Sequence, residues 1–115
     1  MMLLFTLLAC GSDETTDSAP ASTVDCATAP ADVTWDASIH GIFLDYCTAC
    51  HSANNPDNRY GAPAEVNFDT EQDVYDLADR VRVRVLQDAD MPIGGGVYEE
   101  DLSLLDIYLT CRLGK

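Results

Sequence analysis

The chain has 115 residues, with 20 acidic and only six basic side chains, so its formal net charge is −14. Such a length suffices for one small domain. The charge argues against nucleic acid as a partner, since phosphates repel an acidic protein. A small domain buries a modest core, and a disulfide, a metal or a cofactor often adds the missing stability. Five cysteines in 115 residues agree with that expectation.

The first nine residues (MMLLFTLLA) form an apolar run. They are too few to span a bilayer as a helix, which needs about 20 residues. With Cys10, the run resembles the lipobox of bacterial lipoproteins; the alternative is an apolar stub with an incidental cysteine. The resemblance implies that residues 1–9 are a signal peptide and that Cys10 carries lipid. We then expect an exported protein, anchored by lipid in the cell envelope, facing the periplasm or at the outer membrane.

Residues 10–32 are small, polar and acidic, with scattered prolines. A segment of this composition cannot bury a core and is expected to be a flexible tether. The folded domain is therefore predicted over residues 33–115. Its first helix is expected over Asp36–Cys50, with Thr34 or Asp36 as N-cap. Apolar side chains and cysteines recur there at helical spacing, at Ile39, Phe43, Cys47 and Cys50.

A second helix is predicted to follow the loop over residues 52–69, which prolines and glycines interrupt. Thr70 and Asp73 form a capping-box pattern with Asp in place of Glu or Gln. The apolar face of this helix is predicted to comprise Val74, Leu77, Ala78, Val81 and Val85. Residues 80–85 also alternate basic and apolar side chains with period two, as a strand would. The capped helical pattern that leads into them favours a helix.

The last helix is predicted over Glu99–Arg112, behind a glycine-rich loop over residues 90–97. Acidic residues occupy its first turn, and Gly114 follows as a stop. Its apolar face comprises Leu102, Leu105 and Leu109. With no strong sheet pattern, the fold class is all-α, with three main helices joined by loops.

Residues 47–51 read Cys-Thr-Ala-Cys-His, the attachment motif of c-type haem. Cysteines at i and i+3 lie on one side of a helical turn, where each can form a thioether to a haem vinyl group. His51 follows on the same side and can coordinate the iron. A zinc site needs four ligands, and the remaining candidates Cys26, Cys111 and His40 show no paired spacing. A thioredoxin-like pair would follow a strand, whereas this motif ends a helix.

The segment from Ile39 to His51 resembles the first helix of class I cytochromes c, with Phe43 at the family's aromatic position. Met91-Pro92 and the three glycines after it resemble the distal loop of that family. The resemblance implies a small cytochrome c fold wrapped around one covalent haem c, with His51 and Met91 as axial ligands. It places Leu105 and Tyr108 at the helix crossing, and a proline carbonyl, that of Pro63, beside the His51 ring. The alternative for Met91 is a side chain that fills a gap in the core.

Two further groups of side chains have candidate roles. Arg80, Arg82 and Arg84 are candidate partners of the haem propionates, or they simply offset nearby acids. Once Cys10 is assigned to lipid and two cysteines to haem, Cys26 and Cys111 are expected to form a disulfide in an oxidising compartment.

The first hypothesis is an electron carrier and not an enzyme, because both axial positions of the iron are filled. Its partners would be the membrane, through lipid, and redox proteins with a basic docking surface. The alternative is a haem-based sensing or binding domain, or a haem enzyme subunit, with Met91 as a displaceable sixth ligand. The third hypothesis is a non-haem redox or zinc lipoprotein.

Overall fold

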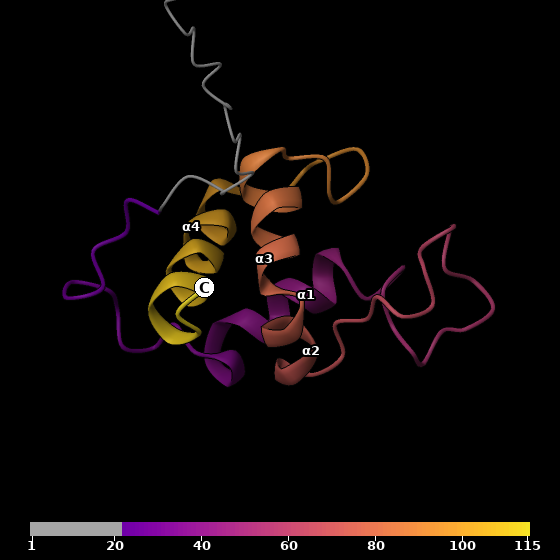
Figure 1. Cartoon of the computed structure of the whole chain (residues 1–115), viewed down its shortest axis with the longest axis horizontal. Helices are drawn as coiled ribbons and strands as arrows, with labels where there is room; N and C mark the ends of the chain where they lie inside the picture. Colours follow the sequence, from indigo (N-terminus) through magenta and orange to yellow (C-terminus); the bar gives the residue numbers. More distant parts are fainter. Residues whose placement is uncertain (1–21) are drawn as a thin grey trace, which may run out of the picture.

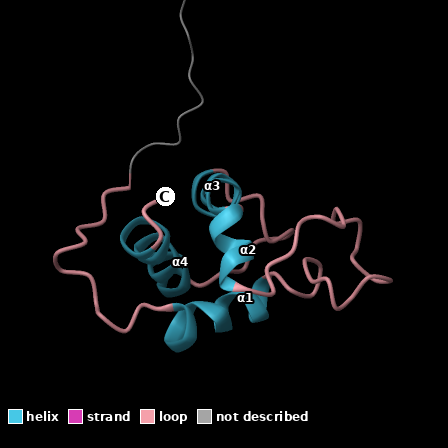
Figure 2. Cartoon of the chain, turned by 60° about the horizontal axis from the view of Figure 1, so that its bottom comes forward, coloured by secondary structure: helices cyan, strands magenta, loops and turns pink. Residues whose placement is uncertain are grey.

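Helices form all the regular structure in the part of the chain that the computed structural model describes, residues 22–115 (Figures 1 and 2). No strand occurs among those residues, so the predicted all-α class is confirmed. The predicted signal peptide, Cys10 and the start of the predicted tether lie outside the described residues. Within them, no helix has the length and apolarity needed to cross a membrane.

The first helix begins in π-helical geometry over Trp35–Ile39 (η1) and continues as α1 over His40–Tyr46. Thr34 caps it, because its hydroxyl accepts a hydrogen bond from the Ala37 amide at 3.3 Å. Ile39 and Phe43 are buried, as predicted for the core-facing side.

This helix ends at Tyr46, so the prediction that it extends to Cys50 was wrong. The amides of Cys47 and Thr48 both donate to the Phe43 carbonyl, at 2.9 and 3.0 Å. Because two amides share this acceptor, the regular helical hydrogen bonding ends here. The backbone of Cys47 has a φ of −120° and is no longer helical. The motif then forms its own turn, in which the amides of Cys50 and His51 donate to the Cys47 carbonyl.

The second helical region consists of α2 (Glu71–Asp76), α3 (Ala78–Val81) and the π-helical η2 (Arg82–Gln87). The capping box is confirmed: the Thr70 hydroxyl accepts from the Asp73 amide, and the Asp73 carboxylate accepts from the Thr70 amide. Residues 80–85 are helical, so the strand alternative is excluded. The buried side chains are Val74, Ala78 and Val81, with Leu77 and Val85 packed at their edge.

The last helix consists of α4 (Glu99–Ile107) and the π-helical η3 (Tyr108–Arg112), which together have the predicted bounds. Gly114 follows in the left-handed region, at a φ of +68°. Leu105, Tyr108 and Leu109 are buried, whereas Leu102 is only half-buried. The buried face is therefore centred on Tyr108. Burial and the neighbouring Glu71 carboxylate, which accepts a hydrogen bond from the Tyr108 hydroxyl, raise the pKa of Tyr108.

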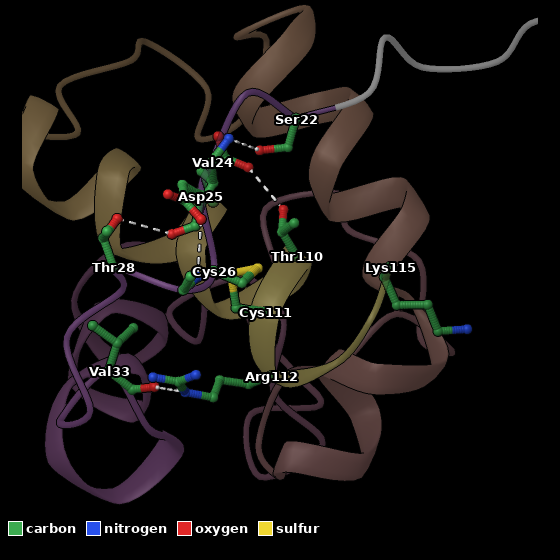
Figure 3. The surroundings of a disulfide bond; sticks show 12 residues. Ser22, Val24, Asp25, Cys26, Thr28, Val33, Thr110, Cys111, Arg112 and Lys115 are labelled. Carbon is green, nitrogen blue, oxygen red and sulfur yellow. Dashed lines mark hydrogen bonds between the residues drawn. A yellow bond between two sulfur atoms is a disulfide. The ribbon is translucent and has the colours of Figure 1, made fainter.

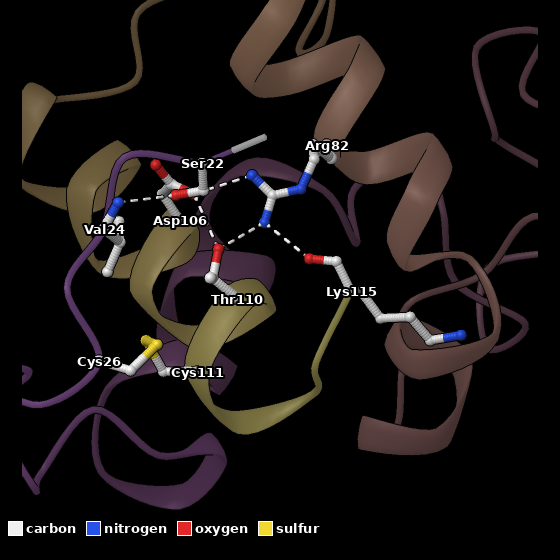
Figure 4. Close-up of polar contacts among 8 residues, drawn as sticks. All are labelled: Ser22, Val24, Cys26, Arg82, Asp106, Thr110, Cys111 and Lys115. Atoms are coloured by element: carbon white, nitrogen blue, oxygen red, sulfur yellow. Dashed lines mark hydrogen bonds and ion pairs between the residues drawn. A yellow bond between two sulfur atoms is a disulfide. The ribbon is translucent and has the colours of Figure 1, made fainter. Parts of the chain in front are cut away.

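A polar cluster joins η2 to the last helix (Figure 4). The Arg82 guanidinium donates to Asp106 Oδ1 at 2.8 Å, to the Thr110 hydroxyl at 2.8 Å and to the Lys115 carbonyl at 3.0 Å. Burial alone would raise the pKa of Asp106, but hydrogen bonds led by that of Arg82 more than offset it, so this pKa lies below its ordinary value.

Residues 22–32, called the strap below, lie along the last helix (Figure 3). A disulfide joins Cys26 to Cys111, the two cysteines that the count left over, with their sulfurs 2.01 Å apart. Arg112 adds hydrogen bonds to the Pro30 and Val33 carbonyls at 2.7 and 3.0 Å. The predicted tether is therefore held to the domain over its C-terminal part. The strap and the 52–69 loop lie at opposite ends of the molecule (Figure 1).

Candidate functional site

A cavity opens among the first helix, the 52–69 loop, the second helical region, the 91–97 loop and α4. Its volume is about 190 Å³. Cofactor and small-molecule sites in proteins are lined mostly by apolar and aromatic side chains. The apolar and aromatic lining residues are Ile42, Phe43, Tyr46, Pro63, Val66, Phe68, Leu77, Val81, Val85, Pro92, Val97 and Leu105. The cavity therefore has the lining of a site for an apolar group.

The segment Cys47–His51, the predicted haem attachment motif, borders this cavity. Cys47 and His51 line it, whereas Cys50 is half-buried and lies outside the lining. Burial, and secondarily Cys50, raises the pKa of the Cys47 thiol to about 12. Disulfide oxidoreductases need the opposite, a pKa lowered to roughly 3.5–7.5 so that a thiolate can attack. Cys47 therefore lacks the reactive thiolate that a thioredoxin-like pair would need at this position.

The His51 ring is held so that one nitrogen is free to bind a metal. Its Nδ1 lies 3.1 Å from the Val66 carbonyl oxygen. Because a carbonyl only accepts hydrogen bonds, Nδ1 must carry the proton, which leaves the lone pair of Nε2 free for coordination. The Phe68 ring packs edge-on against the imidazole, with centroids 5.5 Å apart. This is the tautomer and support that a coordinating histidine needs.

The acceptor of the His51 proton is Val66, so the expectation for the Pro63 carbonyl was wrong. The Pro63 oxygen instead accepts from the Arg59 guanidinium at 2.7 Å. The loop is long enough to bring a residue three positions further on to the ring. It also returns to the motif, because the Phe68 amide donates to the His51 carbonyl at 2.9 Å.

Met91 reaches the same cavity from the loop between η2 and α4. Its amide and that of Asp90 both donate to the Arg84 carbonyl, at 3.1 and 3.0 Å. Gly94, Gly95 and Gly96 all have φ between +70° and +89°, a region that side chains disfavour. The Arg84 carbonyl therefore anchors the start of this loop, and the glycines form its turn. Met91 is half-buried, which differs from a side chain that fills the core.

The three arginines of the second helical region divide into two sets. Arg80 and Arg84 line the cavity and are exposed. Arg82 does not line it, because its guanidinium is bound to the last helix, so its place among candidate propionate partners was wrong. Residues four apart share a helical face, whereas one two positions away lies on the opposite side.

The first and last helices meet at one wall of the cavity. Leu105 lines it, and the Tyr46 hydroxyl donates to Asp101 at 2.7 Å, which links α1 to α4. Tyr108 is buried nearby but does not line the cavity. His40 is also outside the lining; its ring stacks on Trp35 with centroids 4.8 Å apart.

A zinc site finds no ligand set in the described residues, because no three His, Cys, Asp or Glu side chains gather there as metal ligands. The pair of Cys47 and Cys50 has only His51 beside it in the motif, whereas structural zinc takes four ligands.

Two groups at the site were missed by sequence reasoning: the Val66 carbonyl and the Arg59 side chain that also binds it. A backbone acceptor leaves no mark in a sequence. Arg59 did leave a signal, since it is the only lysine or arginine among residues 1–79 of a strongly acidic chain.

No family model matches the chain, and neither the curated proteins nor the solved structures contain a match to it.

Proposed function

We propose that this chain is a mono-haem electron-transfer protein of the cytochrome c type, in which the three helical regions enclose the haem. Cys47 and Cys50 would hold haem c by thioethers, and His51 and Met91 would supply the axial ligands. The observation that carries the proposal is the cavity, which His51, Cys47 and Met91 border together from segments 40 residues apart. When bound, haem supplies reversible one-electron exchange at its iron.

The residues present fit this group. The apolar lining would surround the haem with side chains of low polarity, and low polarity around a haem tunes its potential. His51 offers Nε2 while Val66 holds Nδ1. Arg80 and Arg84 are the cations at the cavity and are the proposed partners of the propionates. Arg84 is also bound to Asp90, at 3.1 Å, so its charge is already partly balanced.

The rest of the proposal concerns location and partners. Export and lipid attachment at Cys10 are supported by the lipobox resemblance, and by a disulfide of the kind that oxidising compartments favour. With a net charge of −14, a redox protein with a basic docking surface is the proposed partner. In this view the membrane is contacted through lipid and not through the acidic domain.

The test is the absorption spectrum of protein matured in a host that attaches haem. We expect covalent haem in the wild type, with the long-wavelength band of sulfur ligation in the oxidised state. Met91→Ala should lose that band and bind carbon monoxide when reduced. Ile93→Ala is the matched control, because Ile93 lies in the same loop but is 82% exposed. Carbon monoxide binding to the reduced wild type would instead favour a sensing or catalytic haem domain.

A further inference from the structure

One side chain organises the loop that carries the acceptor of the His51 proton. The Arg59 guanidinium donates to four backbone carbonyls, those of Ser52, Ala62, Pro63 and Val66. These bonds gather both ends of a stretch of 15 residues around one cation. A guanidinium has five N–H donors in a rigid planar fork, so it can bridge several acceptors that an ammonium could not.

The Val66 carbonyl is the point where this cluster meets the candidate haem ligand. Its oxygen accepts from Arg59 Nη2 at 2.9 Å and from His51 Nδ1 at 3.1 Å. The two donors occupy the two lone pairs of one carbonyl. The guanidinium therefore fixes this oxygen beside the imidazole N–H, and it also places a positive charge one shared carbonyl away from the ring.

We propose that Arg59 is a positioning residue that sets the tautomer and the electron-donating strength of His51 through the shared Val66 carbonyl. The effect on the tautomer is a property of the chain alone, whereas the effect on the iron rests on the proposed haem function. Outer partners of a ligating histidine fix its ring and tune its basicity. A cation beside that partner lowers the basicity of the ligand and so favours the reduced iron.

The first test measures the tautomer in the apoprotein by ¹⁵N NMR of the histidine ring, at a pH where the ring is neutral. The wild type should hold the His51 proton on Nδ1. Arg59→Met removes all four bonds, so a major fraction of the protons should move to Nε2. Arg59→Lys keeps the charge but not the fork and should also show the mixture, and it serves as the second variant if Arg59→Met fails to fold.

The matched control is Arg112→Met, which also removes a guanidinium from backbone carbonyls, those of Pro30 and Val33. Pro30 belongs to the strap, which lies at the end of the molecule opposite the 52–69 loop (Figure 1), and Val33 directly follows the strap in the sequence. This variant should lose stability and keep the wild-type tautomer. A loss of stability by itself would therefore not reproduce the effect of Arg59.

The second test measures the reduction potential of the haem-loaded protein. The potential should fall in Arg59→Met and stay at the wild-type value in Arg112→Met. A tautomer and a potential unchanged in both Arg59 variants would overturn the proposal. If the wild type attaches no haem while Arg59→Met still mixes the tautomers, the haem function fails and the positioning role of Arg59 stands.

Discussion

Replacing both Cys26 and Cys111 with serine should destabilise the domain substantially. The bridge spans a sequence separation of 85 residues, and in the chain-entropy model a loop of that length contributes up to about 4.5 kcal/mol by constraining the unfolded chain. Measured values commonly fall below that ceiling, so we expect a loss of about 2–4.5 kcal/mol in the free energy of unfolding. Urea denaturation followed by far-ultraviolet circular dichroism measures it directly.

The same variant should keep its cavity, because neither cysteine lines it. Haem attachment should therefore match the wild type in the double serine variant. Wild-type protein with its disulfide reduced is the matched control and should unfold at the same urea concentration as the variant. The reasoning is refuted if the variant loses less than about 0.5 kcal/mol, since the strap would then add nothing measurable to folding.

Arg82→Met should cost about 2 kcal/mol in a urea titration, because Asp106 then stays partly buried without its cation. The folded pKa of Asp106 lies below its ordinary value. The stability that this pair adds is therefore present above pH ~4 and is lost as pH falls through the folded pKa. An acid-unfolding profile of Arg82→Met identical to that of the wild type would contradict this. In the apoprotein, the Cys47 thiol should react with iodoacetamide at pH ~8 on the order of 50-fold more slowly than an ordinary thiol. With a pKa of about 12, its small thiolate fraction outweighs the gain in nucleophilicity. Peptide mapping measures the rate, and a rate that reaches its plateau near pH ~9 would contradict the prediction. Thr70→Ala removes the capping box and should lower the free energy of unfolding by about 1 kcal/mol, whereas no change in the urea midpoint would show that the cap is dispensable.

Features that depend on neighbouring residues were predictable from the sequence. The capping box at Thr70, the helical course of residues 80–85 and the stop at Gly114 each follow from side chains within one or two turns. The motif and the methionine loop were found by their residue types. The structure adds that Cys47, His51 and Met91 border one cavity.

Features that depend on long-range contacts were not predictable. The first helix stops at Tyr46 because two amides share the Phe43 carbonyl. No local sequence pattern predicts this shared hydrogen bond. The partner of His51 is set by the path of an 18-residue loop, and that path is organised by Arg59. The direction of the Arg82 side chain, toward the last helix and away from the cavity, is a different case. The helical period already separates it from Arg80 and Arg84, so this error could have been avoided.

The central claim is that the cavity holds one covalently attached haem, and intact-mass spectrometry with peptide mapping tests it most directly. The protein should be produced with its export signal in a host that matures c-type cytochromes, beside a Cys47→Ser, Cys50→Ser double variant. The account predicts a mass increase of one haem, located on the peptide that contains Cys47, Cys50 and His51 and absent from the variant. Free thiols at both cysteines in the exported wild-type protein, with no added mass on that peptide, would contradict it.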